Sequence, residues 1–211
     1  VSNGLSVAGD LDVGGTLDAK GTIAVTGSII MDSLTITDDT IFDGNLTVTG
    51  TLTVAEGVTF TVNGDLTLEG DTEIEGNLVV KGDLSAEEDL TVDGDLTVEG
   101  DLSVTEDLEV GGTLDAQGAT TVGGTAEVGT LNITEDTVFD GDLTITDTLT
   151  VETGKTFTVD GDLTLNKDAD IDGSLEVKGN LSAEKGLVVG EDLIVDDNLT
   201  VVDELSVTGD L

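Results

Sequence analysis

The side chains that could do chemistry in this sequence are carboxylates, hydroxyls and lysine amines. His, Cys and Arg are absent, which excludes catalytic triads, thiol nucleophiles and imidazole or thiolate zinc sites. Paired carboxylates such as Asp38 with Asp39, or Asp196 with Asp197, are the groups that a glycosidase would use. Asp stands at nearly every turn of the repeat described below, however, so we interpret these pairs as turn residues and expect no enzyme activity.

We expect no cofactor, and calcium is the one alternative that the spacing of the acidic residues offers. Two series of Asp recur at every eighteenth position, namely Asp65, Asp83 and Asp101, and Asp71, Asp89 and Asp107. If a fold stacks each series, its carboxylates lie ~5 Å apart, and water, salt or a hard cation must relieve their repulsion. Neither the EF-hand loop nor the nine-residue Gly-rich calcium repeat is present. We therefore favour carboxylates that bond their own turns, with calcium bridging as the alternative.

The charge balance limits the partners of the chain. The sequence carries 46 acidic and 6 basic residues, a formal net charge of −40, which argues against nucleic acid and anionic membrane surfaces. No apolar run approaches the ~20 residues that a membrane helix needs, so we expect no membrane insertion. With 37% apolar residues the chain can still bury a core. Since only four Phe and no Trp or Tyr are present, that core must be narrow and aliphatic.

The elements that would position these residues follow a period of six. Leu or Thr recurs at every sixth position from Leu66 to Leu114, and an aliphatic residue or Ala follows two places later. Residues two apart share one face of a strand, and the intervening Thr, Ser or Glu points the other way. A Gly-Asp or Gly-Asn pair, such as Gly64-Asp65, precedes most units. Since Gly tolerates positive φ and Asx bonds nearby backbone, we expect a corner there.

A longer repeat of 97 residues lies over the short one. The segment SLTITDDTIFDGNLTVTGTLTV from Ser33 returns as TLNITEDTVFDGDLTITDTLTV from Thr130, and 130 minus 33 is 97. We divide the chain into repeats at about 1–97 and 98–194, with a partial third at 195–211, all in one continuous solenoid. The hexad register breaks between Ile29 and Leu34 and between Val58 and Leu66, and we expect a longer strand at the second break.

The outward residues predict how many strands make one coil. At a spacing of 18, hydroxyl residues form a column in each repeat: Thr67, Ser85, Ser103 and Thr121 in the first, and Thr164, Ser182 and Thr200 in the second. Equivalent sites of stacked coils should look alike. The pattern therefore predicts an all-β parallel solenoid with six residues per face, three faces and about 18 residues per coil. Sixteen hexads do not divide by three, so such a coil would rotate each long repeat by one face.

The phrase GDLTVEGDLSV resembles two kinds of protein. It is similar to the repeat-rich shafts of phage tail fibres and bacterial surface proteins, in which GNLTVTGTLTV at residues 44–54 would fit. It also resembles, more weakly, the bactofilins, which are polymer-forming cytoskeletal β-helices. These resemblances imply a structural role, and they transfer no functional residue to this chain.

From the charge, the duplication and these resemblances, we expect a rigid acidic spacer or self-assembling filament subunit that packs on copies of itself. We place it outside the cell, in a surface layer, an extracellular fibre or a phage tail fibre. The alternatives are a bactofilin-like intracellular polymer and a cation-dependent adhesin.

Overall fold

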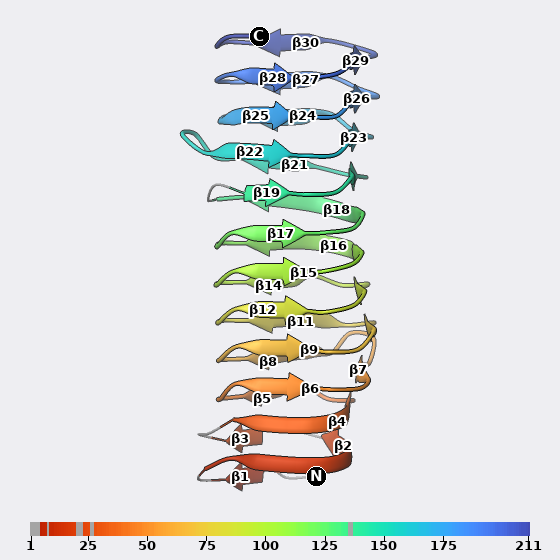
Figure 1. Ribbon diagram of the computed structural model, residues 1–211, viewed down its shortest axis with the longest axis vertical. Coiled ribbons are helices and arrows are strands. Elements are labelled where there is room, and N and C mark those ends of the chain that lie inside the picture. The colour runs from red at the N-terminus through yellow and green to blue at the C-terminus, as the bar shows by residue number, and fades with distance from the viewer. Residues whose placement is uncertain (1–4, 8, 20–22, 26–27, 135–136) are drawn as a thin grey trace.

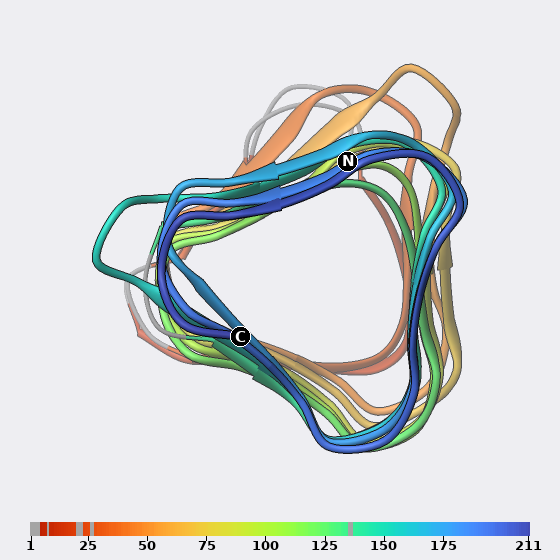
Figure 2. The ribbon, with the colours of Figure 1, turned by 90° about the horizontal axis from the view of Figure 1, so that it is seen from above.

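The chain folds into a rod of short parallel strands wound as a three-sided coil. The computed structural model describes all residues except 1–4, 8, 20–22, 26–27 and 135–136. The strands stack along the rod (Figure 1), and the view down the rod axis shows a triangular cross-section (Figure 2). Over much of the rod, paired residues are eighteen positions apart in the chain, as Leu84 and Leu102 are. The predicted all-β parallel solenoid, with three faces and roughly 18 residues per turn, is confirmed.

Each coil contributes one strand segment to each face, in the chain order first, second, third. Four longer strands turn a corner and serve two faces: β2 (Leu11–Ala19), β4 (Ile29–Ile36), β16 (Leu108–Ala116) and β18 (Ala126–Ile133). The first face holds the ends of β16 and β18 with β1 (Leu5–Val7), β3 (Ile23–Val25), β5 (Thr40–Phe42), β8 (Thr59–Val62), β11 (Asn77–Val80), β14 (Leu96–Val98), β21 (Leu149–Val151), β24 (Ala169–Ile171), β27 (Leu187–Val189) and β30 (Leu205–Val207). The second face holds the beginnings of β2 and β4 with β6 (Leu46–Val48), β9 (Leu66–Leu68), β12 (Leu84–Ala86), β15 (Leu102–Val104), β17 (Thr120–Val122), β19 (Thr137–Phe139), β22 (Thr156–Val159), β25 (Ser174–Val177) and β28 (Leu193–Val195). The third face holds the remaining parts of these longer strands with β7 (Leu52–Val54), β10 (Thr72–Ile74), β13 (Leu90–Val92), β20 (Leu143–Ile145), β23 (Leu163–Leu165), β26 (Leu181–Ala183) and β29 (Leu199–Val201).

The predicted hydroxyl columns are real columns. On the second face Thr67 pairs with Ser85, Ser85 with Ser103, and Ser103 with Thr121. In the second repeat, Thr164, Ser182 and Thr200 pair in the same order on the third face. Outward residues in neighbouring coils therefore resemble one another, as the spacing of 18 predicts.

The long repeat advances by one face, as a three-sided coil requires. Phe60 lies on the first face in β8, and its counterpart Phe157 lies on the second face in β22. Figure 2 shows the consequence: the corner loop between β7 and β8 projects at the upper right, and the loop between β21 and β22 projects at the left. A feature that occurs once per long repeat therefore appears at successive corners. The domain boundaries near residues 97 and 194 stay a prediction.

The two register breaks lie at corners. The first coincides with the irregular pairing of β2 with β4, where the register shifts between Val13 and Thr16. At the second, the expected longer strand is wrong in part, because β8 has four residues and the extra residues form a corner loop. This loop turns at Gly57, whose φ is +71°, and the N–H of Val58 bonds the carbonyl of Ala55 at 3.2 Å. A local hydrogen bond thus holds the insertion outside the stacked strands.

The interior contains one aliphatic layer per coil. Leu at the first position and Val, Ile or Ala at the third position of each unit are almost fully buried from β4 to β27. Where a coil is longer than the others, as between Thr40 and its partner Phe60, two Phe fill the wider space. Phe42 and Phe60 meet edge to face with centroids 5.5 Å apart, and Phe139 and Phe157 repeat this contact at 5.8 Å. The core is narrow and aliphatic, as the composition predicts.

Candidate functional site

The acidic residues at the corners form ladders of hydrogen bonds between coils. The Oδ1 atom of Asp65 accepts the backbone N–H of Asp83 at 3.1 Å, and Oδ1 of Asp83 accepts that of Asp101 at 2.9 Å. Oδ1 of Asp101 accepts the N–H of Ala119 at 2.9 Å. Each carboxylate thus caps the corner that lies one coil further along the rod. The ladder connects neighbouring coils at the corners, where strand pairing stops. Its hydrogen bonds are charge-assisted, which makes them stronger than those between neutral groups.

The second series behaves in the same way. Oδ1 of Asp89 accepts the N–H of Asp107 at 3.1 Å, and Oδ1 of Asp107 accepts the N–H of Thr125 at 2.7 Å. The expectation that these carboxylates bond their own turns is wrong in one respect, because the donor belongs to the next coil. The corner of the next coil presents its N–H group to the carboxylate.

Two of the glycines that precede a ladder residue, Gly82 and Gly100, leave no room for a Cβ atom. A Cβ atom at Gly82 would lie 2.2 Å from Oδ1 of Asp65, and one at Gly100 would lie 2.4 Å from Oδ1 of Asp83. Among the described glycines only Gly9, Gly57 and Gly154 have positive φ. The expected reason for the corner glycines, a positive φ, is therefore wrong for Gly82 and Gly100. At these two corners the glycine of one coil lies against the carboxylate of the preceding coil, whereas Glu88 and Glu106 precede the ladder residues Asp89 and Asp107.

One ladder residue has a shifted pKa. Asp162 is the counterpart of Asp65 in the second repeat, and its Oδ1 accepts the N–H of Asn180 at 2.7 Å. This backbone hydrogen bond, aided by the side-chain amide of Asn180, lowers the pKa of the Asp162 carboxyl below its usual 3.8. The Nζ atom of Lys178 lies 2.7 Å from Oδ1 of Asp160, and that hydrogen bond raises the pKa of Lys178. The ladder thus favours the ionised form of Asp162.

A contact that the sequence does not suggest holds the loop between β21 and β22. The Glu191 carboxylate accepts the N–H of Gly154 at 3.1 Å and the hydroxyl of Ser174 at 3.2 Å. Gly154 and Glu191 are 37 residues apart, so the contact spans two coils. The first repeat has Gly94 at the position of Glu191, which means that this brace differs between the two copies. No periodic signal marks it.

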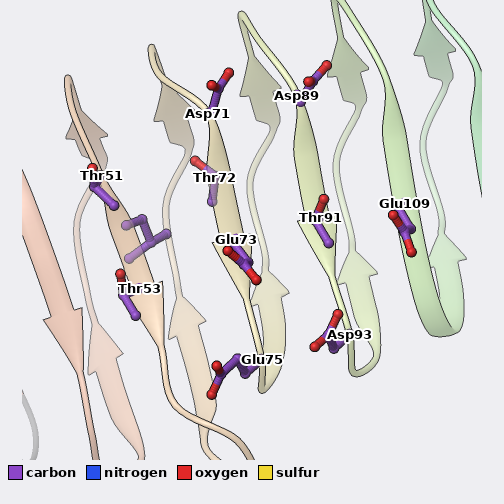
Figure 3. Close-up of a pocket in the computed structure, with 11 residues that line it drawn as sticks. Thr51, Thr53, Asp71, Thr72, Glu73, Glu75, Asp89, Thr91, Asp93 and Glu109 are labelled. Carbon is purple, nitrogen blue, oxygen red and sulfur yellow. The ribbon is translucent and has the colours of Figure 1, made fainter.

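A shallow acidic groove lies on the third face. It has a volume of about 620 Å³ and runs over β7, β10, β13 and β16. Figure 3 shows its carboxylates, which include Glu73, Glu75, Asp93 and Glu109, on successive coils, with Asp71 and Asp89 at one edge. Threonine side chains separate several of them. An open groove of this kind exposes its charges to water and brings no general acid and base together in an enclosed space.

The proposed cation sites stay a prediction. The ladder bonds of Asp65, Asp83, Asp101, Asp89 and Asp107 occupy one oxygen of each carboxylate, and Oδ2 of Asp65 also accepts the side-chain amide of Asn45 at 3.0 Å. Asp71 lies in the same column as Asp89 at the groove edge (Figure 3). Within the described part of the chain, no set of three or more acidic residues is arranged to hold a metal ion. The described residues also contain no helix long and apolar enough to cross a membrane.

The carboxylate pairs considered for catalysis lie at corners of the coil. Oδ1 of Asp39 accepts the N–H of Thr59 at 2.9 Å, and the carbonyl of Asp38 accepts the Thr40 hydroxyl at 2.8 Å. Asp196 and Asp197 form a corner between β28 and β29 and are exposed. These bonds agree with the interpretation of the pairs as turn residues.

Stacked three-residue strands, a continuous aliphatic core and corner ladders define a parallel β-solenoid, a structural class of repeat protein. The sequence profile of one family with this architecture, the bactofilins, described as polymer-forming cytoskeletal, matches residues 52–159, just over half of the chain. The chain belongs to the bactofilin family. No curated protein and no solved structure matches it. The resemblance to bactofilins is thereby confirmed, whereas the resemblance to tail-fibre shafts stays a prediction.

Proposed function

We propose that this chain is the subunit of a cytoskeletal filament in which solenoids stack end to end. The family is structural and polymer-forming, which supports the expected self-assembling role and, among the alternatives, the bactofilin-like intracellular polymer. The expected placement outside the cell came from the charge and the tail-fibre resemblance. Detection of the chain in intact and in permeabilised cells, with a cytoplasmic marker as control, tests the location.

The observation that carries this proposal is the match of residues 52–159 to a polymer-forming family, and the apolar layer of the coil at β29 and β30 is the surface on which we test it. Leu199 and Val201 of β29, and Leu205 of β30, occupy inward core positions, yet Leu205 is 37% exposed. One coil earlier, Leu181 and Leu187 occupy the same positions and are at most 1% exposed. Any coil that stacks on β29 and β30 would cover this apolar layer and pair with the edges of these strands. In the proposal, a second copy supplies that coil.

The test compares Leu199→Asp with Thr200→Asp. Both variants add one carboxylate to β29, but Leu199 faces the core layer and Thr200 faces solvent. Electron microscopy at physiological salt should show filaments one rod wide for the parent and for Thr200→Asp. Leu199→Asp should give single rods of roughly 55 Å, the length of stacked coils ~4.8 Å apart.

The circular dichroism of all three proteins should show the same strand content, which separates lost assembly from lost folding. Single rods in the parent at every concentration and salt would overturn the proposal, and so would filaments of equal length in Leu199→Asp.

A further inference from the structure

The second face carries a long outward row without a charged side chain. In eight consecutive coils its outward residues are Ile30, Thr47, Thr67, Ser85, Ser103, Thr121, Val138 and Thr158. All eight are half-buried or exposed, and the two apolar ones, Ile30 and Val138, are 50% and 41% exposed. We call the seven residues from Ile30 to Val138, which these two apolar side chains bound, the neutral row. An outward surface of this length without charge is unusual in a chain whose net charge is −40.

The other two faces differ at the same level of the rod. The third face carries Glu73, Glu109 and Glu127 at its outward positions, next to the acidic groove. On the first face the uncharged run is shorter and ends at Asp115, which pairs with Thr97. Two copies with this charge repel each other wherever carboxylates face carboxylates. The neutral row is therefore the side of the rod on which a second copy can approach most closely.

The side-chain types of the neutral row are also arranged symmetrically about Ser85. Thr67 and Ser103 lie one coil from the centre, Thr47 and Thr121 two coils, and Ile30 and Val138 three coils. A two-fold axis through Ser85, perpendicular to the rod, would thus place hydroxyl residues on hydroxyl residues. It would place Ile30 on Val138 of the partner subunit, burying two exposed apolar side chains against each other.

The charges beyond the row favour this antiparallel arrangement. Asp12 precedes the row on the same face, and Thr158 and then Glu176 follow Val138. Parallel, in-register copies would oppose Asp12 to Asp12 and Glu176 to Glu176 of the partner subunit. In the antiparallel arrangement Asp12 faces Thr158 of the partner subunit and Glu176 lies beyond the contact. We propose that two copies pair side by side and antiparallel through the neutral row.

The size of the row indicates a weak contact. Six coil steps of ~4.8 Å give a length of about 29 Å, and a three-residue strand is about 10 Å wide, so each copy buries on the order of 300 Å². This is well below the area of a standard stable interface. Pairing should therefore require high concentration and enough salt to screen the corner carboxylates. It uses the side of the rod and does not depend on end-to-end stacking.

Cross-linking of single-cysteine variants tests the pairing, because the chain has no Cys of its own. Facing sheets lie ~10 Å apart, too far for a disulfide, so the probe is a short thiol-specific bismaleimide. Ser85→Cys should cross-link to itself, and Ile30→Cys should cross-link to Val138→Cys when the two are mixed. Ile30→Cys alone should give little product. The matched control is Ser182→Cys, because Ser182 is the counterpart of Ser85 in the second repeat and lies on the third face.

The yields decide between arrangements. The proposal predicts at least a tenfold higher dimer yield for Ser85→Cys than for Ser182→Cys, and a yield that rises with salt. Efficient cross-linking of Ile30→Cys to itself would indicate parallel pairing and overturn the proposal. Equal yields for all variants would indicate random collision and also overturn it, as would no product at all. The charge variant Ser85→Asp should reduce association in concentrated solution, whereas Ser182→Asp should leave it unchanged.

Discussion

Two corner glycines offer a direct test of how the coils fit together. A Cβ atom at Gly112 would lie 2.5 Å from Oδ1 of Asp95 and 2.7 Å from the carbonyl oxygen of Gly94. At Gly186 the nearest atom would be Oδ1 of Asp168, at 3.3 Å and at the end of a side chain. The same substitution to Ala should therefore cost much more at Gly112 than at Gly186.

The magnitude follows from this geometry. Since the backbone of Gly94 cannot move without disturbing its own coil, we expect Gly112→Ala to cost about 1–3 kcal/mol, as overpacked cores do. Gly186→Ala should be close to neutral, because the Asp168 side chain can yield by a few tenths of an ångström and Ala restricts the unfolded chain, which stabilises by roughly 0.4–1 kcal/mol. At ~2.1 cal/mol/K per residue the entropy of unfolding is about 0.44 kcal/mol/K for this length, so Gly112→Ala should lower Tm by about 2–7 °C.

The assay is thermal unfolding of both variants and the parent, followed by circular dichroism at one protein concentration and salt. Native-state hydrogen exchange at the corner near Asp95 provides a local measurement, because unfolding of a solenoid can begin in one part of the array. Equal Tm shifts for the two variants, or a neutral Gly112→Ala, would refute the close approach of glycine to the preceding coil.

Three further predictions concern stability. Phe60 is fully buried against Phe42, so Phe60→Ala should lower the free energy of chemical unfolding by about 3–5 kcal/mol. Thr61→Ala, at the next outward position, should lower it far less. Similar losses of stability in the two variants would contradict the edge-to-face core contact. The pKa of Asp162 is lowered in the folded state, so its ladder bond stabilises the fold above the ordinary pKa of 3.8, and this contribution is lost as pH falls through the folded-state pKa. The Tm difference between the parent and Asp162→Asn should therefore be constant near neutral pH and shrink in acid. A Tm difference that stays the same from neutral pH to strong acid would argue against the ladder. Because the net charge is −40, Tm should rise with NaCl, and a Tm independent of salt would contradict the role of charge repulsion. At equal ionic strength, calcium should raise Tm more than magnesium only if the Asp columns bridge cations.

The coil could be predicted from the sequence because a solenoid makes its packing periodic. The alternation of Leu66 and Leu68 inward with Thr67 outward is a property of any strand, and stacking turns similarity at a spacing of 18 into contact. The column from Thr67 to Thr121 was therefore sufficient to infer three faces. The rotation of Phe157 onto another face than Phe60 follows from the same arithmetic.

The candidate site was predictable only in part. The Asp columns follow from the spacing, but the direction of their hydrogen bonds does not, because it depends on the height of one corner above the corner of the preceding coil. That height also places Oδ1 of Asp65 in the space that a Cβ atom at Gly82 would need. A positive φ and a close approach select the same residue type, so the sequence alone could not distinguish them.

By itself the sequence determined the strand period, the number of faces, the aliphatic core and the positions of the corners, since each depends on residues close in the chain or at one fixed spacing. The tertiary structure decided where the inserted residues at Ala55–Val58 go, how Glu191 reaches Gly154 across two coils, and which outward residues form the neutral row. These depend on the coils that are shorter or longer than the others, which shift the register of Ile30, Thr47 and Thr67 away from a spacing of 18. Which side chains such irregular coils bring together depends on how the coils stack in three dimensions.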